Sequence, residues 1–199
     1  MKNLIWHILK EETQNIDSFI DVIESKYPEV SDFKDILMSF IEESGCQKIE
    51  FANFKHPALG VALHNGVLIN NVALSKPLPM LMFIILHEVA HQYQFKKYGA
   101  DEMYRCYSGE VKINDAAEFM KNTEIVADKY AALKIRQLIK SGYIDSSFVP
   151  PQMYKNVSIG QISQMIEQFK NQFRMNNVTS PEEISSFLYN MIKKEFWKN

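Results

Sequence analysis

The sequence predicts an α+β fold, in which helical segments flank a small mixed sheet. Two observations support this class. Apolar residues recur at helical spacing in the first and last parts of the 199-residue chain, and between residues 48 and 71 the pattern changes to that of short strands. The chain is 46% hydrophobic with a net charge of −2, which excludes intrinsic disorder and suffices for one domain or a compact pair of subdomains.

The amino-terminal segment, residues 1–46, is predicted to be helical. Apolar residues recur at helical spacing from Leu4 to Ile23, and Pro28 ends the first helix. A second helix is expected to begin near Ser31 or Asp32, and Gly45 is its predicted end.

The central segment, residues 47–142, begins with strands. Residues 48–54 alternate between apolar and polar as in a half-buried strand. Residues 60–70 contain two β-prone runs joined at Asn65-Gly66, and both of these turn residues accept positive φ. We therefore expect a hairpin within a sheet of about three strands.

A long central helix is predicted next, from about Leu78 to Tyr98. Pro77 and Pro79 open it and Gly99 ends it, and its first half is apolar nearly all round, as expected of a buried helix. Residues 99–114 lack clear periodicity and predict a loop or flap.

A further helix is expected to begin with a capping box formed by Asp115 and Glu118 and to run to Gly142. In the carboxy-terminal segment, residues 143–199, the pair Pro150-Pro151 precedes two helices. Their predicted caps are Ser158 with Gln161 and Ser180 with Glu183.

Composition also limits the cellular setting. The balance of 22 basic and 24 acidic residues predicts neither a nucleic-acid partner nor binding to acidic membranes. Residues 1–10 lack the pattern of a signal peptide, and the longest apolar run, residues 78–86, is too short to span a bilayer. Cys46 and Cys106 are too few for a disulfide scaffold, so we expect a soluble, cytoplasmic protein.

The most informative motif is His87-Glu88-Val89-Ala90-His91. Histidines four residues apart lie on one face of a helix, so both imidazoles can bind a single ion, and neutral imidazole suits Zn²⁺. Glu88 lies between them in sequence, where its carboxylate can reach a metal-bound water and take its proton.

A catalytic zinc site needs a third protein ligand. No histidine follows His91, and Lys97 occupies the place of the last histidine in an HExxHxxGxxH pattern. His64 and His56 precede the helix and are minor alternatives. A downstream carboxylate is favoured, and Glu124 is the first choice, with Glu118 and Glu110 in reserve.

Glu124 and Asp128 lie one helical turn apart, flanked by the small residues Ala127 and Ala131, which allow two helices to approach closely. Glu124 can then bind the metal. Asp128 can accept a hydrogen bond from the second nitrogen of a metal-bound imidazole, which fixes its tautomer.

These residues resemble the gluzincin class of zinc metallopeptidases, and the chain length is similar to that of the compact members called minigluzincins. The resemblance implies a zincin-like fold with one Zn²⁺ bound by His87, His91 and Glu124, Glu88 as general base and Asp128 orienting His87. It also implies that the strand before the metal helix binds a peptide substrate along its edge. That strand comprises Leu59, Gly60, Val61, Ala62 and Leu63.

One feature departs from the larger members, which often carry a downstream histidine to stabilise the oxyanion. A tyrosine or arginine must serve instead. The candidates are Tyr104, Arg105, Tyr107, Tyr130 and Tyr154.

The leading hypothesis is a zinc-dependent metallopeptidase in which Glu88 activates a zinc-bound water to hydrolyse peptide bonds. Its partner would be a peptide or protein substrate. The alternative is a non-catalytic zinc-binding protein that keeps the zincin fold in a regulatory or binding role. A third hypothesis is a helical adaptor that binds no metal.

Overall fold

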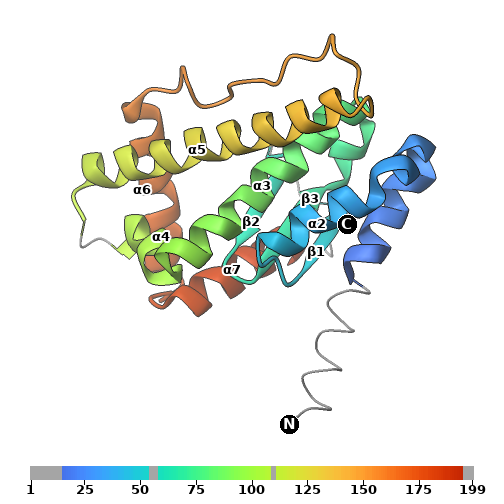
Figure 1. Cartoon of the computed structure of the whole chain (residues 1–199). Coiled ribbons are helices and arrows are strands. Elements are labelled where there is room, and N and C mark those ends of the chain that lie inside the picture. Colours follow the sequence, from blue (N-terminus) through green and yellow to red (C-terminus); the bar gives the residue numbers. More distant parts are fainter. Residues whose placement is uncertain (1–14, 54–57, 109–110, 195–199) are drawn as a thin grey trace.

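The computed structural model describes residues 15–53, 58–108 and 111–194, and it confirms the α+β class. Helices surround a three-stranded sheet (Figure 1). The predicted helix over residues 4–14 and the candidate ligands His56 and Glu110 lie outside the described residues.

The sheet is mixed and comprises β1 (Ile49–Ala52), β2 (Gly60–Leu63) and β3 (Gly66–Asn70). Its strand order is β1-β3-β2, with β1 parallel and β2 antiparallel to β3. The predicted hairpin is confirmed, and β2 forms one edge of the sheet.

The expected conformation of the hairpin turn is wrong. Among the described residues, positive φ occurs at Asn177 and at three glycines, Gly45, Gly99 and Gly142, but not at Asn65 or Gly66. Gly66 serves a different purpose, because a Cβ there would lie 2.6 Å from the Lys48 carbonyl oxygen on the neighbouring chain segment. Close approach of two backbones, rather than a left-handed turn, requires this glycine.

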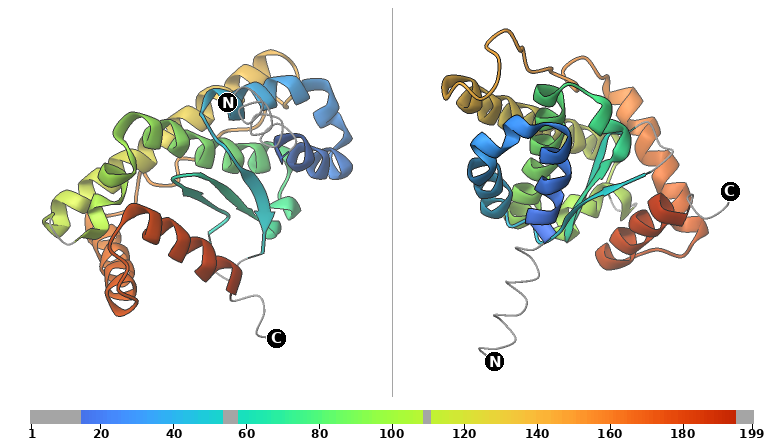
Figure 2. Two further views of the ribbon diagram at one scale, coloured as in Figure 1. Left: turned by 90° about the horizontal axis from the view of Figure 1, so that it is seen from below. Right: turned by 90° about the vertical axis from the view of Figure 1, so that its right-hand side faces the viewer.

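Helix α3 (Leu78–Tyr98) is the centre of the molecule and has the predicted bounds. It follows Pro77 and ends before Gly99, whose φ of 81° is accessible to glycine at little cost. Residues 81–87 are all buried. The helix packs against β2 and β3 on one side and against α5 (Ile113–Lys140) on the other (Figure 2).

The amino-terminal helices complete the main core. Residues 15–26 are helical, a 3₁₀ helix η1 (Pro28–Phe33) follows, and α2 (Lys34–Glu43) packs against α3. The second α-helix therefore begins later than predicted, because the segment with Ser31 and Asp32 is a tight 3₁₀ turn. Gly45 has φ 79° just after this helix, which confirms its predicted end.

The prediction of a loop or flap over residues 99–114 is wrong for most of the segment, since α4 (Ala100–Ser108) is a helix. Such a short helix is stable mainly through packing, and α4 contacts α3, α5, α6 and α7. The predicted cap of the next helix is also displaced. Helix α5 begins at Ile113, so Asp115 lies within its first turn instead of capping it.

The carboxy-terminal helices are α6 (Ile159–Met175) and α7 (Pro181–Lys194). Their predicted caps are confirmed: Ser158 and Gln161 form a capping box, and Ser180 and Glu183 exchange side-chain-to-backbone hydrogen bonds.

Helix α7 lies across the sheet from α3. Successive residues of β3 point to opposite faces, so Val67 and Ile69 pack in the main core with α3, whereas Leu68 packs towards Leu188 of α7. The sheet is thus covered on both faces. Within the described ranges, no helix combines the length and apolar character needed to cross a bilayer.

Candidate metal centre

Two histidines of α3 point towards α5. His87 and His91 lie one helical turn apart, their side chains are nearly inaccessible at 3% and 10% exposure, and their ring centroids are 5.1 Å apart. Imidazoles rarely lie this deep in a protein without polar partners.

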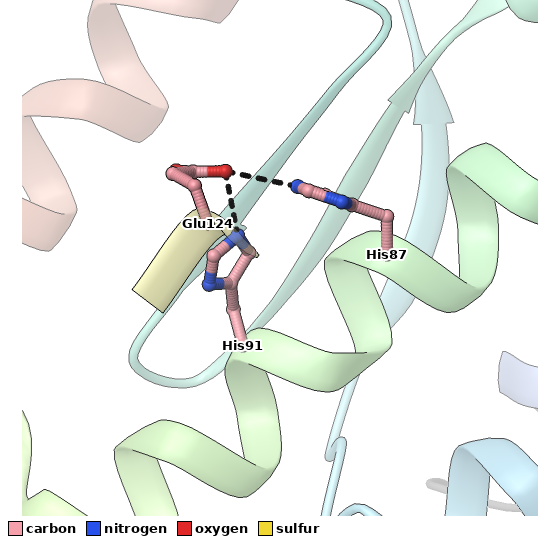
Figure 3. Close-up of side chains that lie close together, drawn as sticks. All are labelled: His87, His91 and Glu124. Carbon is pink, nitrogen blue, oxygen red and sulfur yellow. Dashed lines mark hydrogen bonds and ion pairs between the residues drawn. The ribbon is translucent and has the colours of Figure 1, made fainter. Parts of the chain in front are cut away.

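Glu124 of α5 faces both rings. One carboxylate oxygen, Oε2, lies 3.0 Å from His87 Nε2 and 3.5 Å from His91 Nε2 (Figure 3). One potential ligand atom from each of the three residues lies within 4.8 Å of the other two. The structure therefore brings together the three residues predicted as metal ligands, from helices far apart in sequence.

Each imidazole is oriented through its second nitrogen. His87 Nδ1 lies 3.0 Å from Asp128 Oδ1, and Asp128 Oδ2 accepts a hydrogen bond from the Tyr154 backbone N–H. His91 Nδ1 lies 2.8 Å from Gln94 Oε1. Both Nε2 atoms are left to face Glu124.

Sequence reasoning found Asp128 but missed Gln94. The available signal was a buried amide three residues after His91, which becomes informative only once the burial is known.

The protonation of the metal-free cluster follows from these contacts. Burial opposes the charging of His87, but hydrogen bonds to Asp128 and Glu124 outweigh it and raise the pKa of His87 to about 10. Burial likewise opposes the charged form of Glu124, yet the two histidines hold its pKa below its ordinary value. A proton shared with His87 therefore balances the carboxylate when no metal is bound.

The donor set fits a divalent transition metal. Two neutral imidazole nitrogens and one carboxylate oxygen match the three-ligand pattern of catalytic zinc sites, and Asp128 and Gln94 supply the outer hydrogen bonds that such imidazoles usually make. The described residues can thus hold a metal ion, although imidazole and carboxylate ligands also suit other divalent metals.

Glu88 lies between this cluster and the sheet. A Cβ added to Gly60 of β2 would lie 2.4 Å from Glu88 Cγ, so the two residues are in close contact. Burial raises the pKa of Glu88, although the neighbouring histidines and the Ala62 backbone amide partly oppose this shift.

A cavity of about 250 Å³ joins these features. Its walls include the three candidate ligands, Glu88 and residues of the β2 segment. The rest of the lining is largely apolar and comes from α3 to α7; it includes Phe95, Met103, Tyr107, Phe119, Phe169 and Leu188.

The β2 edge presents its backbone towards this cavity. The carbonyl of Leu59 accepts a hydrogen bond from the Asn70 N–H of β3, so by alternation Gly60 and Ala62 direct their backbone groups away from β3. Two side chains fix the end of this edge. Tyr104 Oη accepts from the His64 N–H, and Gln92 Nε2 donates to the carbonyls of Leu63 and Gly66.

The candidate oxyanion donors occupy different places. Tyr154 stacks on His87 with a centroid distance of 5.8 Å, and its hydroxyl interacts with Glu124. Tyr104 and Tyr107 line the cavity. Tyr130 packs against Tyr93 and Lys134 outside the cavity lining, and Arg105 pairs with Glu102 on the surface of α4.

The alternative metal ligands are not brought to the cluster in the described part of the chain. His64 lies beyond the strand end, where Tyr104 holds its backbone, and Glu118 is exposed on α5.

Comparisons with protein-family models, with curated proteins and with solved structures find no match for this chain. An assignment of function therefore depends on the geometry of the site.

Proposed function

We propose that this protein is a zinc-dependent metallopeptidase of the gluzincin type with a zincin-like fold. One observation carries the proposal: a set of three metal-ligand residues, a half-buried carboxylate and the edge of a strand border the same cavity. A structural metal site would require the ligands but neither the cavity nor Glu88.

His87, His91 and Glu124 would hold the zinc ion. When bound, zinc supplies a Lewis acid that makes water more acidic and a carbonyl carbon more electrophilic. Asp128 and Gln94 keep both Nε2 lone pairs directed at the ion, because each fixes the Nδ1–H tautomer.

Glu88 would act as the general base. It takes a proton from the water that attacks the peptide carbonyl, and it returns this proton to the amine nitrogen as the C–N bond breaks. Burial raises its pKa above the ordinary carboxyl value, which makes the carboxylate a stronger proton acceptor.

The substrate would lie extended along β2. The outward backbone groups of Gly60 and the outward carbonyl of Ala62 can pair with a peptide backbone, which gives affinity with little demand on sequence, while the Ala62 N–H faces Glu88. The apolar cavity wall formed by residues such as Phe95 and Phe169 would take its side chains.

Tyr154 is the best-placed candidate for stabilising negative charge on the carbonyl oxygen. Its ring is stacked on one candidate ligand and its hydroxyl interacts with another, so the O–H lies at the edge of the reaction space. Loss of one such donor typically lowers the rate by about 10²–10³.

The experiment compares the wild type, Glu88→Gln and Tyr154→Phe, each loaded with one zinc per chain. Each is incubated with an unfolded, alkylated protein mixture, and new termini are identified by mass spectrometry. We expect Glu88→Gln to keep its zinc and to cleave about 10²–10⁴-fold more slowly than the wild type. Tyr154→Phe should cleave about 10²–10³-fold more slowly.

Undiminished cleavage by Glu88→Gln would refute the assigned base. A zinc-loaded wild type that cuts no protein or peptide would instead favour the non-catalytic zinc-binding alternative. A wild type that takes up no metal would refute both.

A further inference from the structure

Gln94 makes two hydrogen bonds that connect the two metal-binding helices. The residue lies on α3, three residues after His91, and is almost fully buried at 5% exposure. Its Oε1 lies 2.8 Å from His91 Nδ1, and its Nε2 donates to the Thr123 carbonyl of α5 at 2.8 Å. Thr123 directly precedes Glu124.

We propose that Gln94 is a positioning residue of the metal centre, which orients His91 through its amide oxygen and ties it through its amide nitrogen to α5 beside Glu124. The proposal rests on the metal centre of the proposed function, but it does not depend on peptide hydrolysis.

The direction of the amide follows from hydrogen-bond chemistry. The Thr123 carbonyl can only accept, so the Gln94 atom facing it must be the NH₂ group. The amide oxygen therefore faces His91, and Nδ1 of that ring must carry the proton. The lone pair of His91 Nε2 is then free for a metal, so one side chain selects the tautomer that binding requires.

The same side chain links a histidine to the third ligand. Glu124 belongs to α5, whereas both histidines belong to α3, so the spacing of these helices sets the size of the site. Because Gln94 bonds to the peptide group next to Glu124, rotation of His91 and displacement of α5 are coupled. Asp128 provides the corresponding link between His87 and α5.

No other common side chain reproduces both bonds at this length. Glutamate keeps an acceptor for His91 but offers no donor to Thr123 when ionised, and it adds a negative charge beside a cluster that already holds Glu124 and Asp128. Methionine has a similar length and removes both bonds. Gln94→Met therefore removes the hydrogen bonds to His91 and to Thr123, whereas Gln94→Glu removes only the hydrogen bond to Thr123.

Gln92 provides a matched control on the same helix. It is a glutamine of equal burial, 4% exposed, and its Nε2 donates to the carbonyls of Leu63 and Gly66 in the hairpin. Gln92→Met thus removes buried amide hydrogen bonds near the site without touching an imidazole.

The test measures zinc affinity by chelator competition and the hydrogen bonding of His91 Nδ1–H by ¹⁵N NMR of the zinc-loaded protein. Gln94→Met is expected to weaken zinc binding by about 10–100-fold and to shift or broaden the His91 Nδ1–H signal, because this proton loses its acceptor. Gln94→Glu should retain that signal, and Gln92→Met should bind zinc within about threefold of wild type. Cobalt(II) absorption spectra should change for Gln94→Met alone.

Zinc binding by Gln94→Met within threefold of wild type, with the position and width of the Nδ1–H signal unchanged, would overturn the proposal. Equal weakening in Gln92→Met would also overturn it, because the effect would then be general destabilisation. Should Gln94→Met not fold, Gln94→Asn, shorter by one methylene, takes its place with the same expected outcome. The variant His91→Ala separates failure of the proposed metal centre from failure of the role of Gln94. Undiminished zinc binding in this variant would refute the metal centre itself.

Discussion

The contact between Gly60 and Glu88 offers a sharp test of how the proposed general base is placed. A Cβ built on Gly60 would lie 2.4 Å from Glu88 Cγ, 2.7 Å from Oε1 and 2.8 Å from Cδ. Real Cβ atoms essentially never make contacts below 3.0 Å. Gly60 is not among the residues with positive φ, so alanine is compatible with the backbone there. The effect of Gly60→Ala should therefore arise from the clash with Glu88.

The magnitude can be derived from the geometry. Relief of the clash requires Glu88 Cγ to move by roughly an ångström, and Cγ is close to the backbone, so the whole side chain must change rotamer or β2 must shift. Overpacking of this kind typically costs about 1–3 kcal/mol. Glu88→Ala removes the three atoms nearest to that Cβ, so in that background Gly60→Ala should cost far less. The expected coupling energy is about 1–3 kcal/mol.

The assay is a double-mutant cycle. The free energy of unfolding is measured by urea denaturation for the wild type, Gly60→Ala, Glu88→Ala and the double variant. Gly160→Ala serves as a control, because a Cβ there meets only Ser158 Oγ at 3.9 Å. Gly60→Ala should also lower any peptidase activity, because it displaces the proposed base, while zinc stays bound by its three ligands.

Additivity of the two substitutions within about 0.5 kcal/mol would refute the reasoning, since uncoupled sites add within that margin. It would mean that Glu88 does not occupy the space in front of Gly60 in solution.

Two further predictions concern the metal centre. Zinc at 1,000 times its dissociation constant should raise the free energy of unfolding of the wild type in urea by about 4 kcal/mol through mass action. The Glu124→Gln variant should lose most of this gain. An equal gain in both proteins would exclude Glu124 as a ligand. In the metal-free protein, the raised pKa of His87 adds to the free energy of unfolding below pH 6.5, and this contribution is lost as the pH rises towards 10. The lowered pKa of Glu124 adds to the free energy of unfolding above pH 4.5, and this contribution is lost as the pH falls below that value. The difference in unfolding free energy between wild type and Glu124→Gln, measured with a chelator, should therefore be greatest between about pH 4.5 and 6.5, and a difference independent of pH would contradict the assigned contacts.

Features that depend on neighbouring residues could be predicted from the sequence. The bounds of α3 follow from Pro77 before it and Gly99 after it, and the caps of α6 and α7 follow from a serine three residues before a glutamine or glutamate. Proline geometry, glycine φ and capping hydrogen bonds act over three or four residues, so they can be recognised without the fold.

The candidate ligands were accessible to sequence reasoning for a similar reason. His87 and His91 share a helix face by spacing alone. Glu124 required chemical elimination, because no histidine follows His91, and the tertiary structure then placed its carboxylate 3.0 Å from His87.

Other features were decided only by packing between distant segments. Helix α4 has only nine residues, too few for stability in isolation, and it forms where α3 and three other helices contact it. Gly66 is required by the approach of Lys48, which the hairpin sequence does not contain.

The surroundings of the ligands depend on the same long-range contacts. Gln94 and Tyr154 became recognisable only when α5 and the segment after it were placed against α3. The sequence by itself thus determined the bounds of α3, the caps of α6 and α7 and which residues have metal-binding chemistry, because these depend on short-range geometry. The tertiary structure decided which side chains orient that chemistry, because a hydrogen bond between residues 94 and 123 leaves no local pattern in the chain.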